Sequence, residues 1–283
     1  MQGWGSCDLG STPSAPKIKF RMDNIFLLKL LISFLAGSIW VILTTVIADK
    51  YGDKIAGLIA GLPSITIFIL LFLALVQGPI FAVKVTSVTP IMAGIESLFL
   101  IVFCFISIKN SFKKSLVSAL VVWFLLATLT YFLHFENYSI SLISFVVLFL
   151  ISYLLMKKIP SLELSQKKKI IYTPKIILCR GLGGGMVVAL AILMGKIGGP
   201  ALAGIFPGFP AIITSTLIIT FYAHGLEFSR AISKNALLGI VGLVIYSIIV
   251  RYTYLPLGIF IGTLLSIFIS FFSGYLFLIA QKK

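Results

Sequence analysis

The sequence predicts an all-α polytopic membrane protein, and three observations support this class. Of its 283 residues, 59% are hydrophobic and 11% are charged, whereas about a quarter of the residues in an ordinary soluble domain are charged. The mean hydropathy of +1.13 implies more apolar surface than a soluble chain of this size can bury, since most of its exterior must still face water. The apolar residues also occur in runs of about 20, the length that a membrane-spanning helix needs.

Nine apolar runs are long enough to cross a bilayer, so we expect about nine transmembrane helices. The stretch before the third run contains Pro79, Lys84 and Pro90, which leaves eight or ten spans open as alternatives. The nine runs cover 25–47, 55–76, 88–108, 115–133, 138–156, 176–195, 201–222, 232–250 and 255–279.

Residues 1–24 differ from the rest of the chain. They are rich in Gly, Ser and Pro and show no apolar periodicity. We therefore expect a disordered leader, either native or left over from expression. The apolar run that follows is too long for the core of a signal peptide, and we expect it to be retained as the first span.

The net charge of +15 comes from Lys and Arg in the short segments between apolar runs. Nine spans with the N-terminus outside place 15 of the 23 cations in inside segments and six in outside segments. Because cytoplasmic loops are enriched in Lys and Arg, this bias predicts an N-out, C-in protein of the plasma (cytoplasmic) membrane. The expected partners are the bilayer and anionic headgroups at the basic loops. Nucleic acid is not expected, because no soluble domain could carry such a site.

The second half of the chain repeats the first at a displacement of 147 residues. Between 56–81 and 203–228 this displacement gives 8 identities in 26 positions, including two Gly and a Pro in register. With nine spans, the two copies would cross the membrane in opposite directions. We expect repeat 1 at 25–133, a linker helix with a basic cytoplasmic loop at 134–175, and repeat 2 at 176–283. A parallel duplication is the alternative if the count is eight or ten.

Each copy contains a proline inside a span, Pro63 in the first and Pro210 in the second. Proline removes a helical hydrogen bond, and lipid offers no replacement, so such a break must face protein or a water-filled cavity. Paired interruptions at matching positions indicate the binding site of a transporter; a simple kink is the alternative. The expected site for a small solute or ion consists of Pro63, Ser64, Thr66, Pro207, Pro210, Thr214 and Ser215, together with Glu96.

Glu96 lies near the middle of the third span. A charged carboxylate at that depth costs about 3 kcal/mol, and burial favours its neutral form. We expect Glu96 to bind a cation or to carry a proton. The alternative is a neutral acid that is hydrogen-bonded to a neighbouring helix. The second repeat has no acid at the equivalent position.

Four further residues are candidates for a gate or for headgroup contacts: Arg180, His224, Glu227 and Arg230. Arg180 either extends to the headgroups, binds an anionic group or pairs with Glu96. The other three fall in a short cytoplasmic segment, which in the simplest interpretation is a solvated loop. The glycines that follow Arg180 favour close helix packing.

Cys7, Cys104, Cys179, His134 and His224 show no metal-ligand spacing, so we predict no metal site and no cofactor. The chain also lacks a nucleophile–base pair, which argues against an enzyme. The leading interpretation is a transporter-like protein. A channel or lipid-moving protein and a non-catalytic assembly or regulatory subunit are the alternatives. A homo-oligomer is left open.

The stretch AGIFPGFPA, followed by HGLEFSRAISKNALLG, resembles the small GlpM-type integral membrane proteins. The resemblance covers 199–250, with an echo at 52–94, and it implies a duplicated membrane unit without assigning a chemistry. The first copy departs from the pattern, because Ala60 replaces the first proline and Leu62 the phenylalanine. The family's pattern falls on Ala203, Gly204, Pro207, Phe209, Pro210, Gly225 and Glu227.

Overall fold

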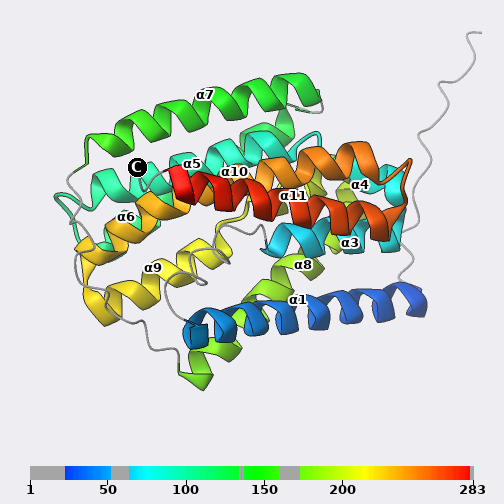
Figure 1. The fold of residues 1–283 in the computed structure, drawn as a ribbon, viewed down its shortest axis with the longest axis horizontal. Helices are drawn as coiled ribbons and strands as arrows, with labels where there is room; N and C mark the ends of the chain where they lie inside the picture. Colours follow the sequence, from blue (N-terminus) through cyan, green and yellow to red (C-terminus); the bar gives the residue numbers. More distant parts are fainter. Residues whose placement is uncertain (1–22, 52–63, 134, 136, 160–172, 281–283) are drawn as a thin grey trace, which may run out of the picture.

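The computed structural model describes residues 23–51, 64–133, 135, 137–159 and 173–280, and within these ranges it contains helices and no strands (Figure 1). The expected leader therefore lies almost entirely outside the described residues, as does most of the basic loop before 175. The elements are α1 (Asn24–Tyr51), α3 (Ser64–Gln77), α4 (Pro79–Val85), α5 (Thr89–Ile106), α6 (Phe112–Phe132), α7 (Tyr138–Lys157), α8 (Pro174–Ala203), η1 (Phe206–Gly208), α9 (Ala211–His224), α10 (Leu226–Thr253) and α11 (Ile259–Ala280).

Seven helical stretches in the described part are long and apolar enough to cross a membrane. They fall on seven of the nine expected spans, and the predicted all-α class is confirmed. The other two expected spans coincide with the shorter apolar stretches Ser64–Gln77 and Ile259–Gly274. Residues 55–63 of the second expected span lie outside the described residues. The total of nine spans stays a prediction.

Two expected loops prove to be helical. Helix α8 continues to Ala203. Its direction changes at Gly199, which has a φ of 72° and directly precedes Pro200. Helix α10 begins at Leu226 and not at 232, because Gly225 reverses the chain within one residue at a φ of 87°. Positive φ is accessible to glycine at little cost, which explains why these connections are so short.

The two halves share their elements at the displacement of 147 residues. Helix α9 begins and ends 147 residues after α3, and the positive-φ glycines Gly78 and Gly225 that follow them are equally spaced. The combined stretch of α4 and α5 corresponds to α10, while α6 corresponds to α11. Helix α7 lies between the two halves, and its role as a linker stays a prediction.

Equivalent helices of the two halves pack against each other in opposite directions. A Cβ atom at Gly37 of α1 would meet Val188 of α8, and one at Gly184 of α8 would meet Val41 of α1. The two contacts exchange equivalent positions, which is the pattern of an approximate two-fold axis. The predicted close packing is thereby confirmed for Gly181, Gly184 and Gly185, whereas a Cβ atom at Gly183 would meet nothing within 4 Å.

Helices α5 and α10, a second equivalent pair, are also antiparallel. Arg251 at the end of α10 bonds to Ser87 before α5, while Arg230 at the start of α10 bonds to Ser107 after α5. Helix α10 contributes to both buried apolar clusters, one built around α5, α6 and α7 and one around α1, α3 and α8. It therefore joins the two halves of the molecule.

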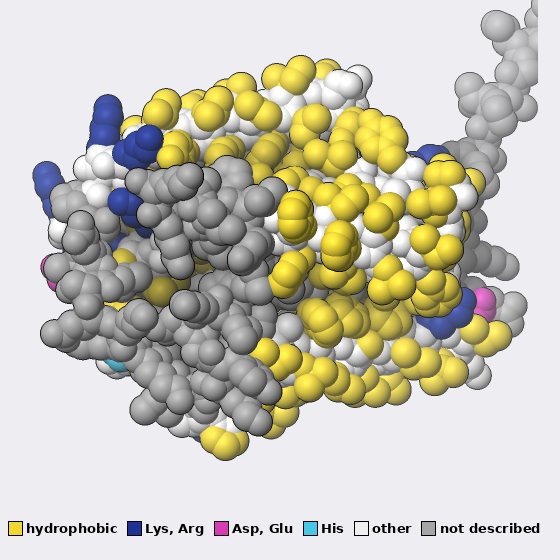
Figure 2. All heavy atoms as spheres, in the orientation of Figure 1, with side chains coloured by type: hydrophobic (Ala, Val, Ile, Leu, Met, Phe, Trp, Pro, Cys, Tyr) yellow, Lys and Arg dark blue, Asp and Glu magenta, His cyan; other side chains and the backbone are white. Residues whose placement is uncertain are grey.

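The outer surface resembles that of a protein surrounded by lipid. Large apolar side chains are exposed along α1, α6, α7 and α11, and they cover the middle of the face in Figure 2. Basic side chains gather at one end of the same view. That end collects the C-terminal ends of α5 and α7, because Ile91 and Ser97 of α5 bond in the same order to Ser141 and Ser152 of α7. An integral membrane protein fits this surface.

Candidate functional site

The second repeat contains the interruption that the sequence predicts. After α8 ends at Ala203, the chain forms the short 3-10 turn η1, and α9 begins only after Pro210. Pro207 and Gly208 are buried within the molecule. The break predicted at Pro210 is therefore confirmed, and it begins already after Ala203.

The start of α3 lies next to this interruption, and the interruption expected at Pro63 falls outside the described residues. Helix α3 begins at Ser64, directly after Pro63. Ser64 and Thr66 are buried, and the Thr66 hydroxyl donates a hydrogen bond to the carbonyl oxygen of Pro207 at 3.3 Å. The structure thus brings together two predicted site residues that are 141 positions apart.

A tryptophan that sequence reasoning missed also contacts the second interruption. Trp123 of α6 donates its indole N–H to the carbonyl oxygen of Gly208 at 2.9 Å. Two carbonyls released by the break are therefore already bonded, one to Thr66 and one to Trp123.

Glu96 lies on α5 close to the same interruption. Met92, one helical turn before Glu96, packs tightly on Gly208. A Cβ atom added to Gly208 would lie 2.7 Å from the Met92 Cβ. Four residues of α-helix advance about 6 Å and return to the same face, which places Glu96 beside this contact. It is 7% exposed, and its Oε2 has no hydrogen-bond partner in the described part of the chain. Neither a pairing with Arg180 nor a bond to a neighbouring helix is therefore found for this oxygen.

The hydroxyl groups after Pro210 differ in their availability. Ser215 and Thr216 both donate to the carbonyl oxygen of Ile212 at 2.8 Å. Thr216 also accepts a hydrogen bond from Arg180 at 2.9 Å, so the Arg180 side chain extends from α8 to α9. The buried Thr214 Oγ1 has no partner among the residues described. Thr214 is thus the hydroxyl of this group that is most open to a ligand.

The other three predicted gate residues lie around the turn between α9 and α10, and all three are helical where a loop was expected. His224 ends α9, and its ring contacts that of Phe228. Arg230 pairs with Glu227 at 3.7 Å and donates to the Ser107 carbonyl oxygen at 3.2 Å. Arg230 therefore joins repeat 2 to the end of α5 in repeat 1.

A second arginine, which sequence reasoning assigned only to membrane topology, joins the repeats at the opposite end. The Arg251 Nη1 lies 3.0 Å from the Ser87 hydroxyl and 3.3 Å from both the Thr86 hydroxyl and the Val83 carbonyl oxygen. Its guanidinium also lies over the Tyr138 ring at 4.2 Å. An arginine thus holds α10 to repeat 1 at each end of the helix.

The contact of Arg251 with Val83 has an equivalent under the approximate two-fold exchange, and that equivalent involves the backbone of Arg230. At the displacement of 147 residues, Arg251 corresponds to Cys104 and Val83 corresponds to Arg230. Arg251 bonds to Val83, and Cys104 lies 4.0 Å from the carbonyl oxygen of Arg230. Only this exchange could have identified Arg251 in advance. Within the described ranges, no three His, Cys, Asp or Glu side chains gather as a metal site would require.

The comparisons with known proteins support the duplication. A family model described as protein of unknown function (DUF3147) matches residues 30–136 and again residues 177–281. The two matches begin 147 residues apart, at residues 30 and 177, which is the displacement found within the sequence. No curated protein and no solved structure matches the chain. The resemblance to the GlpM-type proteins stays a prediction.

Proposed function

The chain belongs to the DUF3147 family and carries its unit twice, and we propose that it is a transporter-like membrane protein for a small solute or ion. The observation that carries the proposal is the contact between Thr66 and Pro207, which joins the start of α3 to the interruption before α9 beside the buried Glu96. Paired broken helices near the centre of a duplicated membrane unit are the usual location of a transport site.

The two repeats cross the membrane in opposite directions in this proposal. The antiparallel packing of α1 with α8 and of α5 with α10 supports the inversion. Each repeat then contributes four spans, and α7 is the odd helix that reverses the second copy. The result is a plasma-membrane protein with nine spans. Its N-terminus lies outside the cell, and its C-terminus lies in the cytoplasm.

The interrupted helices end inside the bilayer in this arrangement. Helices α3 and α9 have 14 residues each and are about 21 Å long, whereas the hydrocarbon core is about 30 Å thick. Their N-termini carry partial positive charge and approach each other at the Thr66–Pro207 contact. The hydroxyls of Ser64 and Thr214 supplement this site.

Glu96 exchanges a proton or binds a cation at this site. Its Oε2 is buried and makes no hydrogen bond within the described residues, and leaving such a group unpaired is costly. A buried carboxyl oxygen without a hydrogen bond therefore points to a ligand or a proton that binds the carboxyl group during part of the transport cycle.

Arg230 and Arg251 act as the two gates. Each ties α10 to repeat 1, at opposite ends of the α5–α10 pair. Alternating access requires that one end opens while the other stays closed. Release of one arginine while the other remains bound would produce this motion.

Flux in proteoliposomes tests the proposed function. The full chain is reconstituted with a pH-sensitive dye inside, and a panel of small organic acids, amines and inorganic ions is added outside. We expect at least one solute to move together with protons, and Glu96→Gln to abolish the proton signal. Leu243→Gln, at the equivalent position of repeat 2, is the control and leaves the flux intact. Proton-coupled flux that survives Glu96→Gln would exclude Glu96 from the mechanism.

A further inference from the structure

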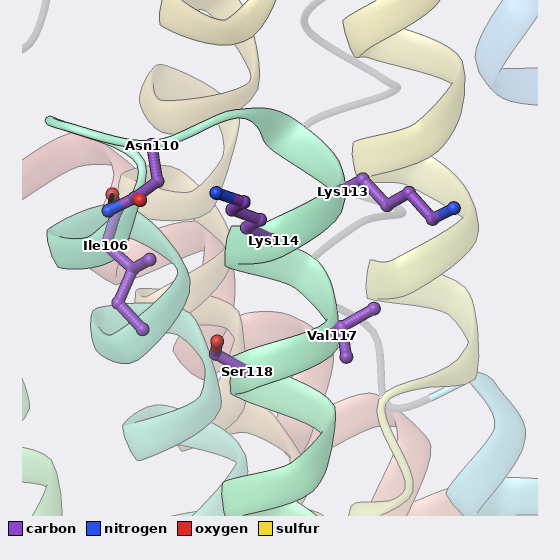
Figure 3. A pocket seen from close by; sticks show the side chains of 6 residues that line it. All are labelled: Ile106, Asn110, Lys113, Lys114, Val117 and Ser118. Atoms are coloured by element: carbon purple, nitrogen blue, oxygen red, sulfur yellow. Dashed lines mark hydrogen bonds between the residues drawn. The ribbon is translucent and has the colours of Figure 1, made fainter.

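A cavity of about 570 Å³ lies at the basic end of the molecule, between the end of α5 and the start of α6 (Figure 3). We propose that it binds an anionic phospholipid, with the headgroup phosphate at the lysines and an acyl chain along α6. This inference does not depend on transport. The cavity is lined by Ile106, Asn110, Lys113, Lys114, Val117 and Ser118.

The polar part of the cavity suits a phosphate group. Lys113 and Lys114 are both exposed and belong to the first turn of α6. The Lys114 side chain points toward Asn110, whereas Lys113 extends from the other side of the helix (Figure 3). Two cations at the N-terminal end of a helix face the positive end of its dipole. A bound anion would offset that repulsion and would accept hydrogen bonds from Lys114 and Asn110, while Lys113 adds its charge at the same helix end.

The apolar part of the cavity continues as a stripe that suits an acyl chain. Val117, Val121 and Leu125 follow one another at intervals of four residues and therefore share one face of α6. Their side chains are 51%, 51% and 65% exposed. The cationic group and the apolar stripe meet at Val117, as the headgroup and chains of a phospholipid do.

The position of the cavity also favours a lipid of the cytoplasmic leaflet. It lies at the end of the molecule where α5 and α7 end, and this end also carries Lys157 and Lys158 of α7. The cytoplasmic leaflet carries the anionic lipids, which attract basic residues close to a helix end. Charge and location thus point to the same occupant.

Native mass spectrometry of the full chain in detergent tests this site, with phosphatidylglycerol as the probe and phosphatidylcholine of the same acyl chains as the neutral reference. Each lysine near an anionic surface contributes about a factor of five to binding, so Lys113→Gln with Lys114→Gln should weaken binding of the first phosphatidylglycerol about 30-fold. Lys157→Gln with Lys158→Gln removes the same charge at the same end and should change it less than two-fold. Val117→Asn should weaken it several-fold.

Three results would overturn the inference. Equal affinity for the two lipids would exclude recognition of the negative headgroup. An equal loss in the control pair would reduce the effect to general charge attraction. Displacement of the lipid by inorganic phosphate at an equal concentration would show that the acyl chain contributes nothing, and that a free anion is the occupant.

Discussion

The two repeats share a scaffold but differ in the polar groups that they place on it. Helices α3 and α9 have the same length and are followed by glycines with the same conformation. Glu96 of repeat 1, however, corresponds to Leu243 of repeat 2, and Arg251 of repeat 2 corresponds to Cys104 of repeat 1. The duplication thus supplies the arrangement of helices, whereas the buried acid and this arginine each occur in one copy only.

The repeats also differ in the continuity of one helix. Repeat 1 interrupts its third stretch between α4 and α5, where Pro90 lies in the first turn of α5, while α10 runs without a break from Leu226 to Thr253. Leu237 occupies the position of Pro90 in repeat 2. Proline lacks the amide hydrogen that a continuous helix needs, so this difference explains why a turn is found in one copy only. That turn carries Thr86 and Ser87, the two hydroxyls that hold Arg251.

The contact between α1 and α8 is the part of the comparison that should be hardest to disturb. A Cβ atom at Gly185 would overlap the carbonyl oxygen of Phe34, whereas one at Gly183 would meet nothing within 4 Å. We expect Gly185→Ala to lower the free energy of unfolding by about 3 kcal/mol, because backbone atoms cannot move aside as side chains do. Gly183→Ala is the control and should leave it unchanged. Denaturant unfolding in detergent would measure both, and equal stability of the two variants would refute the packing described.

The two ends of α10 differ in how strongly an arginine binds repeat 1. Arg251 lies within reach of three acceptors, whereas Arg230 bonds to one carbonyl oxygen and pairs with the exposed Glu227. We expect Arg251→Gln to cost about 2 kcal/mol and Arg230→Gln about half as much. Hydrogen exchange should accelerate at 83–89 in the first variant and at 104–109 in the second. Faster exchange at the same segment in both variants would contradict separate contacts at the two ends.

A substitution of Trp123 tests whether a hydrogen bond from α6 stabilises the second interruption. Trp123→Phe removes the donor to the Gly208 carbonyl oxygen and should cost about 1 kcal/mol. Trp40→Phe is the matched control, because the buried Trp40 Nε1 has no partner among the described residues and its loss removes no bond. Thermal unfolding in detergent would compare the two variants. A smaller loss in Trp123→Phe than in Trp40→Phe would argue against this role.

The helices could largely be predicted from the sequence, because long apolar runs leave few alternatives in a bilayer. The linker expected at 138–156 is α7 at Tyr138–Lys157, and the break at Pro210 follows from the chemistry of proline. Neither turn at Gly199 or Gly225 could be located in this way, since a glycine in a sequence does not reveal its φ angle.

The contacts of the site were less accessible to sequence reasoning. In the sequence, Arg251 contributed only to the count of cations in the outside segments. Its bonds to Thr86 and Ser87 depend on how α10 packs against α5. Trp123 likewise reaches Gly208 from a helix 85 residues away along the chain. Glu96 was identifiable because an acid within an apolar run is rare whatever its neighbours are.

Inverted repeats are the central claim, and the side of the membrane from which equivalent positions are reached tests it most directly. Asn110 and Leu257 are 147 residues apart, both are exposed, and they lie in the equivalent turns after α5 and α10. Asn110→Cys and Leu257→Cys would be introduced separately into a chain whose native cysteines are replaced by serine, and labelled in intact cells with a membrane-impermeant maleimide. We predict that Leu257→Cys reacts from outside, and that Asn110→Cys reacts only after the cells are opened. Labelling of both cysteines from the same face would contradict the inversion.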